Sequence, residues 1–254
     1  MDFRLKVVEE VDIIRFFLFC LCLCLALTPI IVISSALRCA RVDRMNMRNL
    51  LVEFGDSLYY LLLTRQLHDA QSVLDVGCGA RSPLAKVPKH FRAVGIDAFE
   101  ESIAKSKKLG IHDSYIRLDV TLIEKKVKPK TFDAVVALDL IEHLTKREGE
   151  QMLTAMERIA RKKIIVMTPN GFYRQDPYEN NPYQVHKSGW TTRDFHSRGY
   201  KVLGIRGFKM LRGEYATIRF KPWFIWATLS SLSQYILLLF PELSYQIFAV
   251  KNVQ

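Results

Sequence analysis

The stretch "SVLDVGCGARSPL", residues Ser72–Leu84, decides how the chain is expected to fold. It begins with an apolar run that predicts a buried strand and then turns at two closely spaced glycines, Gly77 and Gly79. A strand that ends in a glycine turn exposes backbone N–H groups at its carboxyl end, and glycine lets a ligand approach the backbone closely. By itself, the stretch predicts either a ligand-binding loop or a tight turn.

The residues after the glycines narrow the choice of ligand. A dinucleotide-binding loop has the pattern G-x-G-x-x-G, whose third glycine allows close packing of helix and strand near the pyrophosphate. In this chain, Gly79 is followed by Ala80, Arg81, Ser82 and Pro83, so the third glycine is missing. A P-loop does not fit either, since its Lys-Ser/Thr pair is absent. The spacing therefore disfavours a pyrophosphate ligand.

Strand-like apolar runs alternate with helical patterns along the chain. The runs lie at 73–76, 93–96, 114–118, 132–138, 163–167, 200–208 and from residue 245. Helices are predicted at 46–68, at 100–109 and after two capping boxes, Thr145 with Glu148 and Thr191 with Asp194. The apolar face of the first helix is expected to carry Leu50, Leu51, Phe54, Leu58, Leu61 and Leu62. The alternation predicts a parallel sheet with crossover helices.

Acidic residues stand at the carboxyl ends of four predicted strands. They are Asp75, Asp97, Asp119 and Asp139. In open α/β sheets the carboxyl ends of the strands form the rim where ligands bind, and an acid about twenty residues after the glycines suits ribose hydroxyls. A single acid at such a place is commonly a turn former or a helix cap. Four in series indicate a binding site.

In the order and spacing of these motifs, the chain resembles the class I S-adenosylmethionine-dependent methyltransferases. The resemblance covers about residues 61–207 and the final strand, and is carried by "VLDVGCG", "VGID", "IRLDV" and "FDAVVALDLIEHL". It implies an α/β, Rossmann-like fold with a seven-stranded, mostly parallel sheet whose last strand is antiparallel. It also implies S-adenosylmethionine as the cofactor. Because "ARSPL" stands where many relatives have another glycine, the contacts after Gly79 stay open.

The resemblance further implies a set of cofactor-binding residues. These are Asp75, Gly77, Gly79, Asp97, Asp119, Val120 and Asp139. The first three would line the methionine part of the cofactor, and Asp97 would hold the ribose hydroxyls. Asp119 and Val120 would flank the adenine, while Asp139 would lie near the sulfonium.

Three residues are candidates for a catalytic base. Methyl transfer mainly needs alignment of the reacting atoms and exclusion of water, but a base is useful when the acceptor is a hydroxyl or phenol. The candidates are His143, Glu142 and His186, although either histidine could instead be structural. Some relatives bind a divalent ion through an acid-x-x-Glu-His group and a later histidine, which Asp139 and these three could mimic. Since the same group occurs in relatives without metal, no metal is predicted.

Two uncharged apolar segments indicate contact with a membrane. Residues 16–37 are about long enough to cross the hydrocarbon core as a helix, and the acids before them disfavour a cleaved signal peptide. Residues 222–241 lie between two strands of one sheet, so they are expected to be interfacial or buried. The predicted organisation is a membrane anchor over 1–42, a methyltransferase core over 43–212, an apolar insertion over 213–243 and a final strand over 244–254.

The charge balance is strongly basic, and it points to an anionic partner. The net charge is +11, and several basic residues between 201 and 221 precede the second apolar segment, which suits anionic lipid. No RNA- or DNA-binding module is recognisable, so no nucleic acid partner is expected. The five cysteines show neither a CxxC pair nor a Cys/His metal spacing, which indicates a reducing compartment.

Together these features predict a membrane-associated methyltransferase that moves a methyl group from S-adenosylmethionine to a small or lipid-linked acceptor by in-line displacement. The catalytic domain is expected to face the cytosol, because a cytosolic cofactor must reach it. Two alternatives stay open: a methyltransferase acting on protein or nucleic acid, and a non-catalytic scaffold that binds the cofactor. The acceptor, the particular membrane and the oligomeric state do not follow from the sequence.

Overall fold

The computed structural model describes residues 47–177 and 181–253. The chain divides into two compact units, Met1–Val52 and Glu53–Gln254. Of the first unit only residues 47–52 are described, as the start of a helix, and the anchor predicted over 1–42 lies outside the described residues. Within the two described ranges, no helix combines the length and the apolar character needed to cross a membrane.

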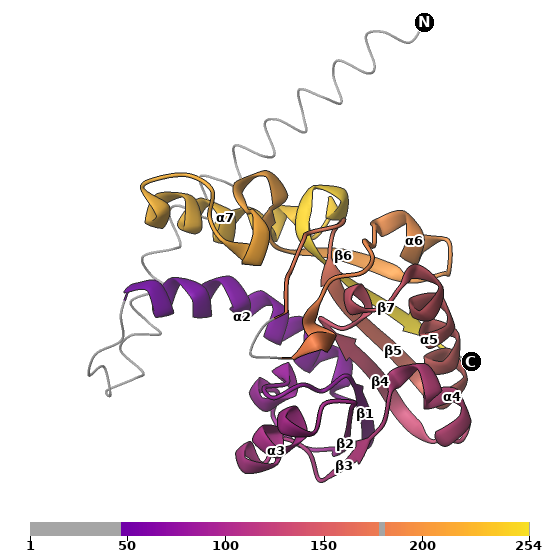
Figure 1. Ribbon diagram of the computed structural model, residues 1–254. Helices are drawn as coiled ribbons and strands as arrows, with labels where there is room; N and C mark the ends of the chain where they lie inside the picture. The colour runs from indigo at the N-terminus through magenta and orange to yellow at the C-terminus, as the bar shows by residue number, and fades with distance from the viewer. Residues whose placement is uncertain (1–46, 178–180, 254) are drawn as a thin grey trace, which may run out of the picture. The chain divides into compact units, whose positions relative to one another are not determined.

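A seven-stranded sheet organises the second unit (Figure 1). In spatial order its strands are β3 (Ser114–Arg117), β2 (Arg92–Asp97), β1 (Ser72–Val76), β4 (Phe132–Leu138), β5 (Ala160–Pro169), β7 (Ser244–Asn252) and β6 (Lys201–Phe208). Strands β1 to β5 are parallel, whereas β7 runs antiparallel to both β5 and β6. The predicted Rossmann-like sheet is confirmed, including its antiparallel last strand.

Two of the main helices begin where the sequence places capping boxes. The main helices are α2 (Met47–Leu67), α3 (Glu100–Leu109), α4 (Ile123–Lys126), α5 (Lys146–Ile159), α6 (Thr192–His196) and α7 (Trp223–Leu237). Both predicted capping boxes are present, Thr145 with Glu148 before α5 and Thr191 with Asp194 before α6. Each box satisfies backbone N–H groups that no helical carbonyl can reach, which is why these starts are readable from the sequence.

Helices cover both faces of the sheet, and two apolar cores result. Val135 of β4 belongs to the core beneath α4, α5 and α6, while its neighbours Ala134 and Val136 belong to the core beneath α2. This alternation follows from the two-residue period of a strand. Since both faces are covered, the central strands are apolar at nearly every position, as parallel strands usually are.

Helix α2 confirms the helix predicted over 46–68, but its buried face differs from the prediction. Leu61, expected on the inner face, is 64% exposed. Leu58 is buried as predicted, and the buried face also carries Tyr59, Leu63 and Leu67 at four-residue intervals. Apolar residues fill so many positions of this helix that the pattern does not select one stripe. Packing selects it, for example through the edge-to-face contact of Tyr59 with Phe248 of β7.

The second apolar segment forms α7, which lies beside β6 (Figure 1). Residues 222–241, expected to be interfacial or buried, are buried on one face only. One face of α7 is buried against the sheet, with Leu232 and Leu237 among its residues, and other apolar side chains such as Phe224 are exposed.

Candidate active site

The glycine turn after β1 adopts backbone angles that favour glycine. Gly77 has φ 68° and Gly79 has φ 57°, both in the left-handed region. A Cβ on Gly77 would overlap the side chain of Leu140, whereas a Cβ on Gly79 would meet nothing within 4 Å. Gly77 therefore allows Leu140 to pack on the turn, and Gly79 presents bare backbone to open space.

Ser82 belongs to a buried hydrogen-bond chain behind this turn. Its hydroxyl donates to Oδ2 of Asp75 at 2.5 Å, and Nε2 of His112 lies 2.8 Å from the same oxygen. Asp75 is 1% exposed and is not part of the pocket wall described below. The resemblance implied that Asp75 lines the methionine part of the cofactor. In the structure its carboxylate lies beneath the turn and supports it. This hydrogen-bond chain also gives "ARSPL" a role after Gly79, because Ser82 of that stretch donates to the carboxylate of Asp75.

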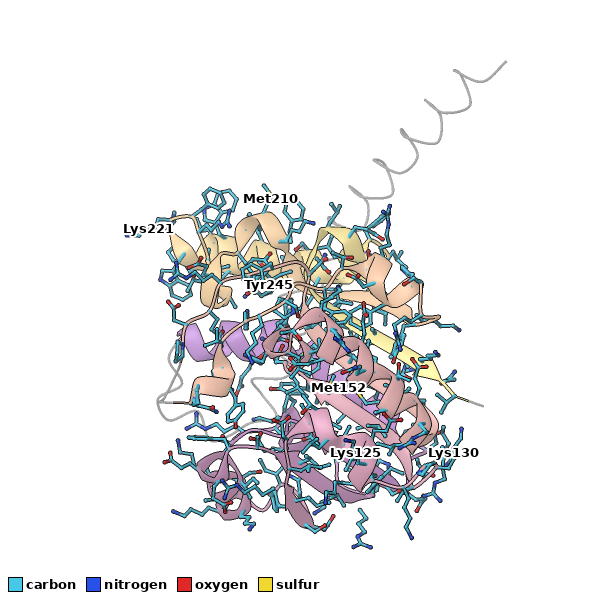
Figure 2. All side chains as sticks on the ribbon, turned by 45° about the vertical axis from the view of Figure 1, so that its right-hand side comes forward. Lys125, Lys130, Met152, Met210, Lys221 and Tyr245 are labelled. Atoms are coloured by element: carbon cyan, nitrogen blue, oxygen red, sulfur yellow. The ribbon has the colours of Figure 1, made fainter. Side chains whose placement is uncertain are left out.

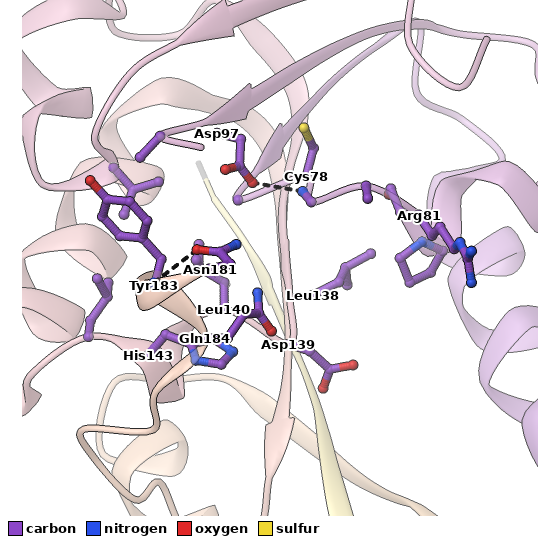
Figure 3. Close-up of a pocket in the computed structure, with 18 of the residues that line it drawn as sticks. Cys78, Arg81, Asp97, Leu138, Asp139, Leu140, His143, Asn181, Tyr183 and Gln184 are labelled. Atoms are coloured by element: carbon purple, nitrogen blue, oxygen red, sulfur yellow. Dashed lines mark hydrogen bonds between the residues drawn. The ribbon is translucent and has the colours of Figure 1, made fainter. Parts of the chain in front are cut away.

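Two backbone groups orient the carboxylate of Asp97. Its Oδ2 accepts from the N–H of Gly79 at 2.8 Å (Figure 3), and its Oδ1 accepts from the N–H of Phe99 at 2.8 Å. Burial raises the pKa of Asp97, while these hydrogen bonds lower it. The side chain lines the pocket, so the lone pairs that the backbone leaves free can accept ribose hydroxyls.

A pocket of about 620 Å³ opens in front of the turn (Figure 3). Six of the seven residues expected to bind the cofactor line it: Gly77, Gly79, Asp97, Asp119, Val120 and Asp139. Oδ1 of Asp119 accepts from the N–H and the hydroxyl of Thr121, at 2.9 and 2.7 Å. Asp119 is therefore a cap as well, and its second oxygen can meet a ligand. Bare backbone and two carboxylates along one wall fit a nucleoside cofactor.

Asp139 and Arg206 contribute opposite charges to the same wall. Oδ1 of Asp139 accepts from Nε2 of Gln246 at 2.8 Å, and Nε of Arg206 lies 3.2 Å from Oδ1 of Asp56. Burial raises the pKa of Asp139, and the charge of Arg206 lowers it. Both residues have positive φ, 54° and 59°, a strain that costs about 1–3 kcal/mol each. For Arg206 this strain marks an irregularity of β6 that turns its side chain into the wall.

Sequence reasoning missed Arg206, Tyr60 and Gln246. Arg206 and Tyr60 line the pocket, and Gln246 orients Asp139. A signal for Arg206 exists, because Gly207 follows it inside a predicted strand and an interior glycine often marks a bulge. Tyr60 carries no comparable signal, since it lies on α2, whose faces the apolar pattern does not separate.

The three candidate bases come together, and of these His143 lines the pocket. The rings of His143 and His186 meet edge to face with centroids 4.8 Å apart. Nδ1 of His143 lies 3.3 Å from the carbonyl oxygen of Val185, and Nδ1 of His186 lies 2.6 Å from that of Tyr173. Because a carbonyl oxygen accepts, we place the proton on each Nδ1, which leaves each Nε2 as an acceptor.

Burial favours the uncharged forms of these three groups. Burial, with His186 as the second cause, lowers the pKa of His143 to about 4. Burial also lowers the pKa of His186. For Glu142, burial and the nearby charge of Asp139 raise the pKa well above its usual range, although the hydroxyl of Thr168 donates to it at 2.9 Å. The pocket therefore presents a neutral imidazole that can take up a proton.

The same three side chains were tested as a metal site. Ligand atoms of Glu142, His143 and His186 lie within 4.8 Å of one another. Asp139 does not belong to this group, and its carboxylate is held by Gln246 instead. Burial raises the pKa of Glu142 and so favours its protonated form, whereas metal ligands must be deprotonated. Two imidazoles and one carboxyl are also a poor set for a hard divalent ion, so the absence of a metal stays a prediction.

The loop after β5 supplies another part of the pocket wall. Asn181, Tyr183, Gln184 and Lys187 line the pocket, and Oδ1 of Asn181 accepts from the N–H of Tyr183 at 2.9 Å (Figure 3). This loop therefore brings an aromatic ring and two amides toward the space beside the cofactor residues.

Comparison with known proteins agrees with this geometry. The family described as "Methyltransferase domain" matches residues 74–167, which span most of β1 to β5. Among curated proteins, pavine N-methyltransferase from Thalictrum flavum subsp. glaucum is 33% identical over 91 residues, or 33% of this chain and 25% of that protein. The chain thus spans about a quarter of the length of this relative.

Similar solved structures show the same fold. The small RNA methyltransferase HEN1 matches with a TM-score of 0.51 and 13% identity, covering 78% of this chain and 25% of that one. The CurJ carbon methyltransferase matches with a TM-score of 0.51 and 11% identity, covering 80% and 55%. The names of these proteins indicate different acceptors, so the fold does not choose among acceptors. Residues 74–167 thus match a methyltransferase domain, and the strand-end residues that line the pocket fit S-adenosylmethionine as its cofactor.

Proposed function

We propose that this protein transfers a methyl group from S-adenosylmethionine to a small or lipid-linked acceptor at a membrane. The observation that carries the proposal is one pocket in which Asp97 and Asp119 share a wall with His143 and Arg206. Bound S-adenosylmethionine supplies an activated methyl group on a positively charged sulfur. The residues of this chain bind the cofactor, orient the acceptor, exclude water and move a proton.

On the cofactor side, the carboxylates act as acceptors for neutral donors. Asp97, whose orientation Gly79 and Phe99 fix, is proposed to accept from the ribose hydroxyls. The second oxygen of Asp119 is proposed to accept from an exocyclic amine. Such groups accelerate the reaction mainly by positioning, because holding two reactants in line can lower the activation barrier by about 7–11 kcal/mol.

On the acceptor side, Nε2 of His143 is the atom proposed to take a proton from a hydroxyl or phenol. The carbonyl of Val185 holds the proton on Nδ1, and the ring of His186 packs against the imidazole. A positioned base of this kind contributes roughly 10²–10⁴-fold to a rate. Glu142 lies behind this pair: its carboxyl accepts from the hydroxyl of Thr168, and its backbone carbonyl accepts from the loop N–H groups of Lys187 and Ser188.

The size and lining of the pocket support a small acceptor or the head of a lipid-linked one. Its volume of about 620 Å³ falls within the range of small-molecule sites, about 300–1,000 Å³. Tyr60, Leu138, Leu140 and Tyr183 give the wall aromatic and apolar surface. Such a lining suits a ring or an isoprenoid head group better than a charged polymer.

The membrane part of the proposal is motivated by residues 16–37, an uncharged run outside the described residues. If this run anchors the chain, a cytosolic cofactor requires the catalytic unit to face the cytosol. Sedimentation after carbonate extraction, followed by protease protection of sealed vesicles, tests both statements. Recovery of the full chain in the soluble fraction would refute the membrane association.

The acceptor is tested with the full chain and methyl-labelled S-adenosylmethionine, offered in parallel to a lipid and metabolite extract, to total RNA and to total protein. We expect label in the lipid and metabolite fraction, and its loss with Asp97→Ala but not with Glu101→Gln, an exposed acid of α3. Label confined to RNA or protein would replace the proposed acceptor class. Cofactor binding by calorimetry without transfer to any fraction would favour a non-catalytic scaffold.

A further inference from the structure

The polar and apolar residues of α7 are inverted relative to those of an ordinary surface helix. Ser230, Ser231 and Gln234 are buried, together with Leu232 and Leu237. Trp223, Phe224, Ile225, Leu229 and Tyr235 are 41–50% exposed. A surface helix of a water-soluble domain normally turns its polar residues to solvent. The exposed face of α7 is therefore more apolar than burial on the sheet requires.

Close backbone packing holds the buried face of α7 to the sheet. A Cβ on Gly204 of β6 would overlap the carbonyl oxygen of Leu237, and a Cβ on Gly207 would overlap that of Ser230. The hydroxyl of Ser233 accepts from the N–H of Phe208 at 3.1 Å. Small residues in close contact are how helices associate where the surroundings are already apolar. The helix thus attaches without using most of its large apolar side chains.

The exposed apolar side chains of the described residues are concentrated in and around α7. Ten of the sixteen large apolar side chains that are exposed among the described residues lie in 210–243. We call the following group the α7 apolar surface: Met210, Phe220, Trp223, Phe224, Ile225, Leu229, Tyr235, Leu239 and Phe240, which are 41–72% exposed. Single exposed apolar residues are ordinary, but a concentration of them marks an interaction site.

Basic residues accompany the α7 apolar surface. Between residues 209 and 242 the charged residues are Lys209, Arg212, Glu214, Arg219, Lys221 and Glu242, four basic and two acidic. Arg219 and Lys221 are exposed on either side of Phe220. Met210 and Lys221 lie on the same side of the molecule as α7 (Figure 2). Tryptophan and tyrosine next to exposed basic residues are typical of the headgroup layer of an anionic bilayer.

We propose that the α7 apolar surface inserts into the interfacial layer of a bilayer that contains anionic phospholipid. The proposal rests on the membrane association proposed above and names the surface of the catalytic unit that makes the contact. Removal of the apolar side chains from water favours this contact, and the nearby basic residues add attraction to the anionic headgroups. The contact is separate from residues 16–37, because it is built from the helix beside β6.

The three tryptophans of the chain allow a direct test. Trp190 is 1% exposed, whereas Trp223 and Trp226 lie in α7, and residues 16–37 contain none. The full chain is mixed with vesicles of phosphatidylcholine and phosphatidylserine whose acyl chains carry bromine near the headgroup, a contact quencher. We expect emission to fall at least twofold relative to unbrominated vesicles. The double variant Trp223→Phe/Trp226→Phe, which keeps Trp190, should show no change.

Two further variants separate insertion from simple attachment. Phe224→Gln/Leu229→Gln should lose most of the quenching, while Leu122→Gln, a matched exposed leucine outside this surface, should keep it. Arg219→Gln/Lys221→Gln should weaken quenching in anionic vesicles and make it resemble that in pure phosphatidylcholine.

Unquenched tryptophan in protein that sediments with the vesicles would overturn the proposal. The face would then be covered by a second copy, seen as a doubled mass in detergent, or by residues 16–37, seen as a cross-link between the two segments. Neither result would affect the proposed methyl transfer, because cofactor binding and label transfer are measured separately.

Discussion

Nε2 of His112 lies 2.8 Å from Oδ2 of Asp75, and both side chains are buried although 37 residues separate them in the chain. His112 precedes β3, and Asp75 lies at the end of β1, so the contact ties the glycine turn to the neighbouring part of the sheet. The hydroxyl of Ser82 completes the arrangement from the other side of the turn. The buried hydrogen bonds of Asp75 with His112 and Ser82 thus support the glycine turn on the side away from the pocket.

Removal of His112 should therefore loosen the turn. In His112→Ala, Asp75 loses one of its two side-chain partners in a buried site, which costs about 1–3 kcal/mol. We expect a loss of that size in denaturant unfolding, with weaker S-adenosylmethionine binding by calorimetry. His196→Ala, an exposed histidine of α6, is the control and should change neither. A His112→Ala protein that binds and unfolds like wild type would show that the contact does not support the turn.

Alanine at three glycines of similar φ should separate stability from binding. Gly77, Gly79 and Gly110 all have φ between 57° and 68°. A left-handed backbone costs an alanine about 1–2 kcal/mol. Gly79→Ala and Gly110→Ala should lose similar stability, because both positions have open space for a Cβ. Gly77→Ala should lose more, since its Cβ overlaps Leu140.

In the same series, S-adenosylmethionine binding should weaken in Gly79→Ala and stay unchanged in Gly110→Ala. Gly79 lines the pocket, whereas Gly110 ends α3 outside its wall. Equal affinity of the two variants would mean that the cofactor does not approach the turn at Gly79.

Asp97→Asn should weaken S-adenosylmethionine binding by more than tenfold. The substitution replaces an oxygen that accepts from a backbone N–H with an amide that donates, so one of the contacts with Gly79 and Phe99 becomes a clash of donors. Calorimetry with wild type and Glu101→Gln as controls measures the effect. Undiminished binding by Asp97→Asn would remove this residue from the cofactor site.

The buried His143 should make the folded state less stable as the pH falls. Its pKa is about 4 in the folded protein and 6.5 ordinarily, so between these values the unfolded chain binds a proton that the folded chain does not. The free energy of unfolding should decrease from about pH 6.5 down to pH 4, by about 3 kcal/mol for this group at 1.36 kcal/mol per unit. Urea unfolding at several pH values, with chelator present, measures it. His143→Gln cannot take up the proton and should lose less over the same interval; parallel curves would contradict the assignment.

Chelation should leave methyl transfer unchanged. The raised pKa of Glu142 favours its protonated form, and the two imidazoles alone offer a weak site for a divalent ion. The rate of label transfer is compared before and after treatment with a chelator, with Mg²⁺, Mn²⁺ and Zn²⁺ added back separately. A loss of tenfold or more that one of these ions restores would establish a metal at Glu142, His143 and His186.

Much of the scaffold was predictable because it depends on local signals. The C-terminal end of α3 and the two capping boxes follow from residues that satisfy backbone groups within one turn. The order of strands and acids along the chain likewise predicts which groups meet at the carboxyl edge of a parallel sheet. For that reason six of the expected cofactor residues were found in one pocket wall.

Local signals in the sequence did not predict those side-chain positions that depend on contacts between distant segments. Whether Asp75 faces the cofactor or the core depends on Ser82 and His112, which come from different segments. Arg206 enters the wall through an irregularity of β6 against β7. The inner face of α2 depends on what the sheet presents to it, so Leu61 was misplaced.

The sequence by itself determined the methyltransferase domain, the expected cofactor and the rim on which the acids lie. These properties depend on periodicity, caps and the direction of parallel strands, all of which short stretches encode. Tertiary structure alone decided that "ARSPL" locks Asp75, that Arg206 and Tyr60 face the pocket, and that α7 turns its apolar side chains outward. Those outcomes depend on which surfaces remain free once distant segments have packed, and no short stretch of sequence contains that information.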